Sequence, residues 1–325
     1  MKLATAIQGF LLSKSAEGVR DRTLESYRQH LRIFSEHLSA DKEIETITTP
    51  DIAAFLDWLR HKYVPMRFSG EDHPLSDKSR RNVYTTLSAL WTWANQELGV
   101  EHIIRRIKAP RFTDPAIVPF SRDDIVALIS ACAKTAAWRT HSGEEVQAAR
   151  PTGTRDRAII LLLLDTGMRA SELCGLNIGD VDLEMGQIRI VQRPGAPGPK
   201  GGVERYVHLG KSARRAVWLY VAQRPDAEVE GNPLFATQRG RRFSRDTLRQ
   251  LTSRLGERAS VKDCHPHRFR HTFAINYLRN QGDVFTLQAI LGHKSLKMVK
   301  RYLALAQVDM EEAHRRASPV DRWAL

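Results

Sequence analysis

Cysteine is scarce in this chain of 325 residues. The three cysteines, Cys132, Cys174 and Cys264, are odd in number and widely spaced, so they offer no disulfide framework. Such cysteine usage is typical of a reducing compartment, and we expect a cytoplasmic protein. The chain is long enough to form two domains that each have a hydrophobic core.

Long apolar runs are missing as well. No stretch approaches the ~18 consecutive apolar residues that predict a membrane-spanning helix. Residues 1–14 are partly apolar, but Gln8 interrupts them and no small-residue cleavage site follows, which favours an amphipathic helix over a signal peptide. Internal repeats and low-complexity segments are also absent from the sequence.

Acidic residues are outnumbered, because 37 Asp and Glu stand against 50 Lys and Arg and give a net charge of +13. The excess is uneven. Residues 1–110 carry 16 basic and 14 acidic residues, whereas the remainder carries 34 and 23. A strong positive charge predicts a polyanionic partner such as nucleic acid, and the second part of the chain carries most of this charge.

The first hundred residues have the apolar periodicity of helices. The apolar faces of three such segments are Leu24, Tyr27, Leu31, Phe34 and Leu38; Ile52, Phe55, Leu56 and Leu59; and Val83, Leu87, Leu90, Trp91 and Ala94. A polar stretch with two prolines and a glycine, His61–Ser79, separates the last two and predicts a long loop. We predict a compact helical bundle over residues 1–109.

A linker follows this bundle. Three prolines and no apolar periodicity mark Lys108–Pro119, and we place the linker at residues 110–119. A second domain is predicted over residues 120–307. The remaining residues, 308–325, form a short C-terminal tail that begins with an amphipathic helical pattern.

Helix signals open the second domain. Ser121 precedes acidic residues and predicts a capped helix. The six apolar residues Ile159–Leu164 predict a buried helix, and Gly167 predicts its left-handed end. Between these helices the polar segment Arg139–Thr154 predicts an exposed insertion.

Two alternating segments, Gln187–Gln192 and Val203–Leu209, predict the strands of an antiparallel hairpin. Their connection contains Lys200 near its tip. A lysine in a loop is ordinarily solvated and has no further role. The segment before it contains three prolines, Pro194, Pro197 and Pro199.

Arginines mark two further positions. Arg169 lies on the turn after the predicted buried helix, and Glu172 three residues later predicts an ion pair with it, which is compatible with a phosphate-binding role. A denser group precedes a later helix and predicts contacts with a phosphate backbone. It comprises Arg239, Arg241, Arg242 and Arg245.

Reactive side chains are densest in His265–Tyr302. Here His267 and Arg270, three residues apart, share one side of a helix that opens with proline, a good position for binding an oxyanion. The sequence LGH then ends in His293, and Tyr302 follows in VKRYLAL. Each of these signals is weak alone, because such residues are common at helix starts and at core edges.

Metal binding is the main alternative for this segment. His267 and His271 have the spacing of a helical metal pair, and Cys264 and His265 precede them. No further carboxylate, cysteine or histidine completes a ligand set at suitable spacing. We therefore expect no metal.

Together, and in this order, the segments of the second domain resemble the tyrosine recombinases of the phage integrase family, which includes the Xer recombinases. TGMRASEL resembles the first arginine box, PKGGVERYVHL the hairpin of the catalytic lysine, and HRFRHTFA the second box. The hairpin departs from the family at Val203, where a lysine is common, and in the longer proline-rich segment that precedes Lys200. The resemblance implies catalytic roles for Arg169, Lys200, His267, Arg270, His293 and Tyr302, with Glu172 in support.

The residue types suit this chemistry. Arginine forks such as Arg169 and Arg270 can hold a phosphate and its developing charge. Tyr302 can attack as a nucleophile, His267 can accept its proton, and a lysine can protonate the leaving oxygen. With so many cationic side chains, we expect neither a metal nor ATP nor another cofactor.

The resemblance also implies an architecture that is mainly α, with two domains. These are an N-terminal SAM-like core-binding bundle and a mixed α+β catalytic domain with a small antiparallel sheet. It further implies a site-specific recombinase or integrase without an arm-binding domain, located in the cytoplasm with the nucleoid. Such an enzyme acts on inverted-repeat sites in double-stranded DNA as a homotetramer, through a 3′-phosphotyrosine and a Holliday junction.

Some expectations stay open at this point. The tail of residues 308–325 could dock in trans on a neighbouring subunit or fold back in cis, and an accessory directionality protein is a further candidate partner. A type IB topoisomerase, which relaxes DNA without site preference, shares the same chemistry. A DNA-binding protein that no longer cleaves is the third hypothesis, although the intact tyrosine and arginines argue against it.

Overall fold

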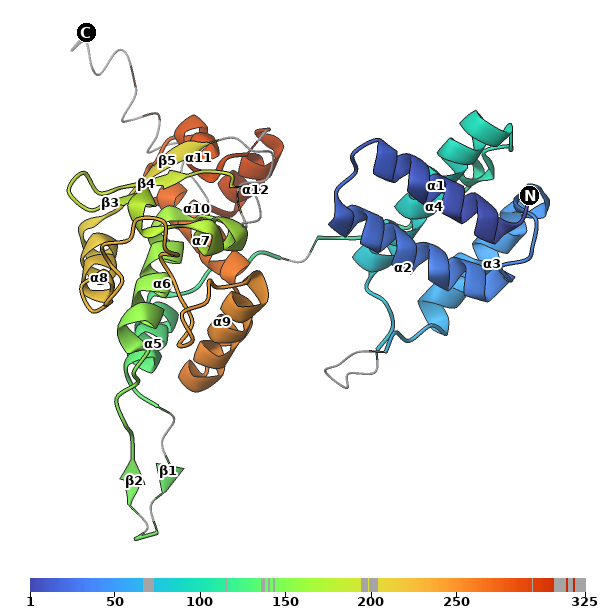
Figure 1. Ribbon diagram of the computed structural model, residues 1–325. Helices are drawn as coiled ribbons and strands as arrows, with labels where there is room; N and C mark the ends of the chain where they lie inside the picture. The colour runs from blue at the N-terminus through green and yellow to red at the C-terminus, as the bar shows by residue number, and fades with distance from the viewer. Residues whose placement is uncertain are drawn as a thin grey trace. The chain divides into compact units, whose positions relative to one another are not determined.

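The computed structural model describes residues 1–66, 73–114, 116–135, 138–139, 141–142, 144–193, 198, 204–293, 295–306, 314 and 318. The chain divides into two compact units, Met1–Ala116 and Ile117–Leu325 (Figure 1). Each unit has a hydrophobic core of its own. Within the described residues, no helix is both long and apolar enough to cross a membrane.

The first unit is a helical bundle, as predicted. Its elements are α1 (Leu3–Ala16), α2 (Asp21–Leu38), the 3-10 turn η1 (Ile44–Thr46), α3 (Thr49–His61), α4 (Asp77–Leu98) and the 3-10 turn η2 (Ile103–Arg106). The predicted apolar face of α4 is buried at every position. Aromatic side chains join three of the helices, because Phe34 of α2 makes edge contacts with Phe55 of α3 and Trp91 of α4 at centroid distances of 4.9 and 5.8 Å.

The second unit is also mainly helical. Its helices are α5 (Arg122–Ala133), α6 (Gly153–Thr166), α7 (Ala170–Gly175), α8 (Lys211–Val221), α9 (Arg245–Ala259), α10 (Pro266–Arg279), α11 (Val284–Leu291) and α12 (Lys297–Ala306), with a 3-10 turn η3 at Ile178–Asp180. Its strands are β1 (Trp138–Arg139), β2 (Glu145–Val146), β3 (Val181–Asp182), β4 (Gln187–Ile190) and β5 (Arg205–His208). This composition confirms the predicted fold class.

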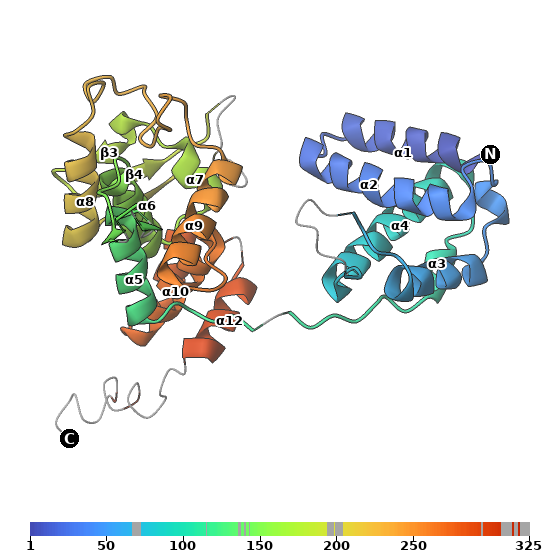
Figure 2. The same cartoon turned by 90° about the horizontal axis from the view of Figure 1, so that it is seen from below.

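Helix α6 is the centre of the second unit. It packs against α5, α8 and α10, and Figure 2 shows α5, α6 and α8 side by side. Four of the six residues in Ile159–Leu164 are buried and two are partly buried, as expected for a core helix. The helix ends at Gly167, whose φ of 58° is left-handed as predicted. A side chain there would also collide with Phe273, so only glycine fits this turn.

The small sheet has the strand order β3-β4-β5 and is antiparallel. Ile188 pairs with Val207, and both side chains are buried, so one face of the predicted hairpin covers the core. The strands are shorter than expected, since β5 begins at Arg205. Lys200 lies in the connection, outside the described residues.

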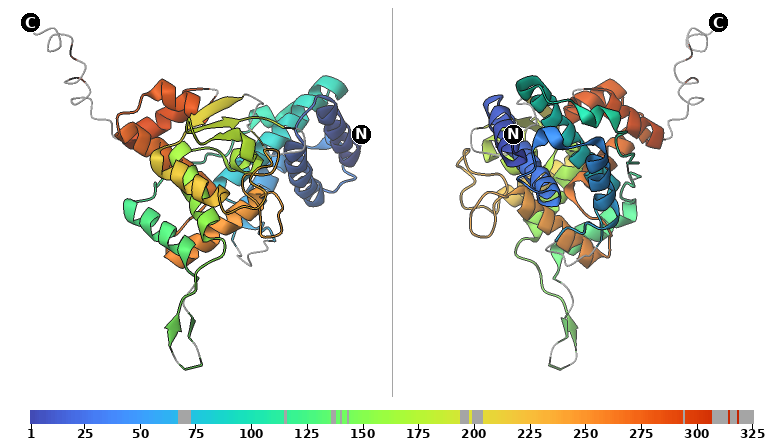
Figure 3. Two further views of the ribbon diagram at one scale, coloured as in Figure 1. Left: turned by 60° about the vertical axis from the view of Figure 1, so that its left-hand side comes forward. Right: turned by 90° about the vertical axis from the view of Figure 1, so that its right-hand side faces the viewer.

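The predicted insertion between α5 and α6 contains the two-stranded ribbon of β1 and β2, which projects away from the helices (Figure 3). Its predicted end at Thr154 was too late, because α6 already begins at Gly153. The base of the insertion is fixed by Asp156, which has a completely buried side chain and accepts from Arg150 at 2.7 Å and Arg155 at 2.8 Å. Two arginines compensate the burial of this charge.

Candidate active site

The start of α10 orients Arg270 into the second unit. His265 is the N-cap, and its Nδ1 accepts the backbone N–H of Arg268 at 3.2 Å. Phe269 packs on Phe120 at a centroid distance of 4.7 Å and anchors the first turn. Arg270 is only 1% exposed, whereas His267, expected on the same side of the helix, is exposed to solvent. Packing against the core thus separates the environments of these two side chains.

The guanidinium of Arg270 connects three segments that are distant in sequence. It donates to the carbonyl of Gly167 at 2.9 Å and to that of Leu291 at 2.8 Å, and its Nη2 lies 2.7 Å from Nε2 of His293. Burial, together with the nearby charge of Arg169, lowers the pKa of Arg270 to about 10. The side chain therefore stays charged at neutral pH.

Arg169 is held on the turn between α6 and α7. Its backbone N–H donates to Glu172 Oε2 at 2.7 Å and its Nη1 to Glu172 Oε1 at 2.9 Å, so the expected ion pair is present. Its Nη2 donates to the carbonyl of Gly292 at 3.0 Å. The side chain of Arg169 remains 24% exposed, and it offers a fixed cation to a ligand from solvent.

Arg205 is a site residue that we did not predict. It donates to both carboxylate oxygens of Glu172, at 2.9 and 2.7 Å, and its Nε donates to the carbonyl of Ile290 at 2.8 Å. The strand pattern of the sequence contained one signal for this role. Arg205 and the buried Val207 are two residues apart, so their side chains lie on the same face of the strand. Arg205 thereby links β5 to the end of α11 and to Glu172, the carboxylate that also pairs with Arg169.

The turn after α11 places His293. Gly292 has a φ of 61°, and a Cβ there would lie 3.3 Å from the guanidinium carbon of Arg205, so a larger residue would be strained and crowded. Because Arg270 donates to Nε2 of His293, the imidazole proton lies on Nδ1. This buried Nδ1 has no hydrogen-bond partner in the described part of the chain. A buried unpaired donor is costly, and a phosphate oxygen would satisfy it.

Tyr302 lies on α12 with its ring against this group. It is 1% exposed, and its ring is nearly parallel to that of His293 at a centroid distance of 6.4 Å. Its hydroxyl lies 2.9 Å from Nδ1 of His271, the residue that follows Arg270 on α10. Burial raises the pKa of Tyr302, so the hydroxyl is protonated in the free protein.

The structure thus brings together five of the residues singled out in the sequence: Arg169, Glu172, Arg270, His293 and Tyr302. His267 lies beside them on the exposed side, with its ring 4.2 Å from that of His271. Lys200 is outside the described residues, so its place relative to this cluster is not described. Four separate segments contribute to the cluster, so its geometry depends on the tertiary structure.

The predicted DNA-contacting arginines divide into two groups. Arg239, Arg241 and Arg245 are exposed before and at the start of α9. Arg242 instead donates to the carbonyls of Cys174 and Leu176 at 3.2 and 3.0 Å, and to Asn177 Oδ1 at 2.6 Å. Its guanidinium stabilises the turn after α7, and we remove it from the set of residues expected to face a ligand.

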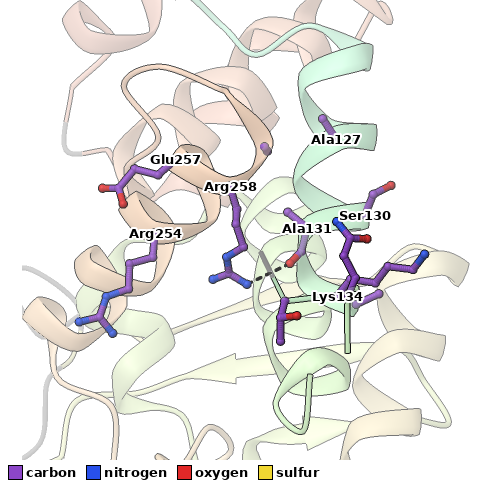
Figure 4. A pocket seen from close by; sticks show the side chains of 11 residues that line it. Ala127, Ser130, Ala131, Lys134, Arg254, Glu257 and Arg258 are labelled. Carbon is purple, nitrogen blue, oxygen red and sulfur yellow. Dashed lines mark hydrogen bonds between the residues drawn. The ribbon is translucent and has the colours of Figure 1, made fainter. Parts of the chain in front are cut away.

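A pocket of about 1210 Å³ lies between the end of α5 and α9, and its lining includes Lys134, Arg254 and Arg258 but none of the cluster residues. Figure 4 shows these side chains and the hydrogen bond, 3.2 Å long, from Arg258 to the carbonyl of Ala131. In the described residues, no group of three or more His, Cys, Asp or Glu is arranged to hold a metal ion.

Buried arginine charge, a buried imidazole donor and a tyrosine hydroxyl in one cluster suit a particular chemistry. The arginines can neutralise the non-bridging oxygens of a phosphodiester, and the hydroxyl can attack its phosphorus. The cluster therefore contains the chemical groups that an enzyme uses to transfer a phosphodiester. The basic excess of the same unit indicates that the phosphodiester belongs to a polyanion.

Comparison with known protein families supports this interpretation of the cluster. The phage integrase family matches residues 120–308, and the N-terminal SAM-like domain of phage integrases matches residues 7–98. The tyrosine recombinase XerD of Mycobacterium tuberculosis is 29% identical over 98% of this chain and 98% of its own. XerD of Bifidobacterium longum is 27% identical over 88% and 96%.

Solved structures extend the comparison to the fold. The Tn1549 transposon integrase in complex with a circular intermediate DNA has a TM-score of 0.74 at 21% identity, covering 97% of this chain and 99% of that one. A lambda integrase dimer bound to a core site has a TM-score of 0.67 at 20% identity, covering 92% and 97%. The chain belongs to the phage integrase family, the tyrosine recombinases that cut and rejoin DNA strands.

Proposed function

We propose that Tyr302 is the nucleophile with which this protein cuts DNA strands during site-specific recombination. The observation that carries the assignment is the convergence of Arg169, Arg270 and His293 around a buried tyrosine of α12. A tyrosine at the edge of a core would not need two arginines and an unpaired imidazole donor beside it. Here the surroundings are those that a phosphate requires.

In the proposed step, the hydroxyl oxygen of Tyr302 forms a bond to phosphorus, and the bond to the 5′ oxygen breaks. A 3′-phosphotyrosine and a free 5′-hydroxyl result. Arg169 and Arg270 hold the non-bridging oxygens, and Nδ1–H of His293 donates to one of them. By its match to the family motif, Lys200 gives its proton to the leaving oxygen. Glu172 supports Arg169, and neither a metal nor ATP takes part.

The wider assignment follows the family. We infer that the substrate is double-stranded DNA with inverted-repeat sites, and that a homotetramer exchanges strands through a Holliday junction. The domain limits that we propose are 1–109 for core binding and 120–307 for catalysis, joined by residues 110–119. The exposed arginines Arg239, Arg241 and Arg245 contact the phosphate backbone. Such a protein acts in the cytoplasm at the nucleoid, where an accessory directionality protein could bind it.

The decisive experiment traps the covalent complex. Purified protein is incubated with genomic DNA from its source organism and denatured, and the protein-linked fragments are sequenced. We expect fragments that share one short site, and Tyr302→Phe should yield none while it still binds a duplex of that site. If Tyr302→Phe still forms an adduct, another residue is the nucleophile. Adducts without site preference would indicate a topoisomerase.

A further inference from the structure

The hydroxyl of Tyr302 is held by a histidine to which the sequence motifs assign no role. Nδ1 of His271 lies 2.9 Å from the Tyr302 hydroxyl oxygen, and the two ring centroids are 5.6 Å apart. Tyr302 is 1% exposed, so this hydrogen bond forms away from water. An attacking oxygen inside the protein needs an acceptor for its proton, and His271 is within hydrogen-bond distance of it.

The direction of this hydrogen bond follows from protonation. Burial lowers the pKa of His271 to about 3, with further contributions from His267, His265, Arg270 and Arg301. Burial also raises the pKa of Tyr302. The imidazole is therefore neutral and the phenol is protonated, so the hydroxyl donates and Nδ1 accepts. This arrangement requires the tautomer of His271 that carries its proton on Nε2.

We infer that His271 is a catalytic residue of strand cleavage, which orients the Tyr302 hydroxyl and receives its proton. The inference rests on the proposed function and assigns the proton acceptor within it. During attack, the hydroxyl proton moves to Nδ1 of His271 as the oxygen–phosphorus bond forms. The bond to the 5′ oxygen breaks, and that oxygen takes a proton from the general acid. Rejoining reverses both transfers, so the step is balanced.

Bound DNA strengthens His271 as a base. The charge of Arg270 is one of the influences that disfavour protonation of His271. In the proposed step a phosphodiester brings a negative charge to this guanidinium. The anion offsets the field of Arg270 on the imidazole, which then holds a proton more readily. Proton transfer from Tyr302 is thereby coupled to the arrival of the substrate.

His267 is the rival for this role, because the family motif points to it. It lies one helical turn before His271 on α10, and its ring contacts that of His271 from the exposed side. This position favours contact with the phosphate of a bound duplex. The His267/His271 spacing, which first suggested a metal pair, is explained here by a solvent-facing and a tyrosine-facing histidine.

The first test compares His271→Ala with His267→Ala in the full-length protein. The substrate is a duplex of the mapped cleavage site, and single-turnover formation of the covalent adduct is measured. We expect His271→Ala to slow this step by about 10²- to 10⁴-fold, the usual contribution of a general base. DNA affinity should remain unchanged. An unchanged cleavage rate in His271→Ala would overturn the inference.

A more acidic phenol at position 302 distinguishes a loss of proton transfer from a loss of folding in the histidine variants. Fluorotyrosine is incorporated at position 302 in each background, since its phenol needs less help from a base. We expect it to restore much of the rate in His271→Ala but not in His267→Ala. Rescue of the His267 variant instead would make His267 the acceptor. If neither variant is rescued, His271 is only structural and the inference is wrong.

His271→Asn is the conservative control. The amide can accept a hydrogen bond from the hydroxyl but cannot take up a proton, so this variant should fold normally and remain slow. Cleavage by it at the rate of the unmodified protein would refute proton transfer. Nitrogen NMR of the free protein tests the contact separately: Nδ1 of His271 should be unprotonated, and its resonance should shift in Tyr302→Phe. An unshifted resonance would contradict the hydrogen bond.

These measurements also separate the inference from the function on which it rests. The unmodified protein is assayed alongside every variant. If it forms no adduct with any duplex, the proposed function fails whatever the NMR result is. If it forms the adduct and the His271 variants do so equally fast, only the role of His271 fails.

Discussion

At the residue scale, Glu172 organises the arginines of the site. Its side chain is completely buried and accepts hydrogen bonds from Arg169 and, through both oxygens, from Arg205. Burial alone would raise the pKa of Glu172, but the hydrogen bonds and charge of Arg205, with the Arg169 contacts, hold it below its usual value. Glu172 is thus a fixed anion that sets where Arg169 points.

Glu172→Gln should destabilise the fold by about 3–5 kcal/mol, because it leaves the largely buried Arg205 and the partly exposed Arg169 without their anionic partner. Urea unfolding measures this loss. The control is Glu204→Gln, which breaks the Arg189–Glu204 pair, where both side chains are 53% exposed, and which should leave stability unchanged. Similar losses in the two variants would contradict the assigned importance of Glu172.

The contribution of Glu172 should also depend on pH. Its folded pKa lies below that of the unfolded chain, which is about 4.3. The stabilisation is therefore fully present above the unfolded value and is lost as the pH falls through the folded one. The stability difference between the unmodified protein and Glu172→Gln should shrink in that acid range. A difference that grows on acidification would reverse the sign and refute the assignment.

Lys200 can be tested at the same scale. Lys200→Ala should slow cleavage strongly, because the departing 5′ oxygen would lack its proton donor. A substrate with a 5′-phosphorothiolate at the cleavage site should restore much of the rate, since a sulfur leaving group needs little protonation. Single-turnover rates on the two substrates measure this. Equal slowing on both would reassign Lys200 to simple charge stabilisation.

At the scale of elements, α12 connects the nucleophile to the C-terminal tail. Val299, Tyr302 and Ala306 are buried in a core shared with α10 and α11, so the helix is fixed on the second unit. The helix predicted at the start of the tail, Val308–Arg316, lies outside the described residues apart from His314. We propose that residues 308–325 dock in trans on a neighbouring subunit.

Deletion of residues 308–325 keeps α12 whole and should preserve binding to a single site. Cooperative assembly of two sites and recombination should weaken, because the apolar end of the tail would no longer find its partner surface. Gel-shift titration and a recombination assay measure the two effects. Trp323→Ala is the matched point variant and should act in the same direction. If the shortened protein recombines at the full rate, the docking proposal is wrong.

At the scale of the whole molecule, charge separates the two units. The basic excess counted at residue 110 is unaltered when the boundary moves to Ala116, because residues 111–116 add one arginine and one aspartate. Both units therefore bring positive charge to DNA, but the second brings most of it. Phosphate contacts release counterions, so affinity falls with salt in proportion to their number.

The salt dependence of DNA binding should follow this division. We expect a steeper fall of the logarithm of affinity with the logarithm of salt for the fragment Ile117–Leu325 than for Met1–Ala116. Fluorescence anisotropy with one duplex at several salt concentrations gives both slopes. Equal slopes would contradict the idea that the second unit makes most phosphate contacts.

The sequence by itself determined the features that depend on local interactions, namely helix positions, helix ends and the order of the motifs. Apolar periodicity and capping placed α4 and α5, and the left-handed end of α6 required Gly167. The order of short motifs indicated the family, because Arg169, Arg270, His293 and Tyr302 each belong to a recognisable segment. The limits of the insertion and of the strands were less accurate, since they depend on neighbours as much as on local preference.

Only the tertiary structure decided which side chains meet. Arg205 became the second partner of Glu172, and Arg242 turned inward to backbone carbonyls. His271, rather than His267, came within 2.9 Å of the Tyr302 hydroxyl. The two histidines are chemically identical and one helical turn apart, and their roles separate because α12 covers one of them. Because His271 is covered by a helix distant in the sequence, no local sequence pattern predicts its burial.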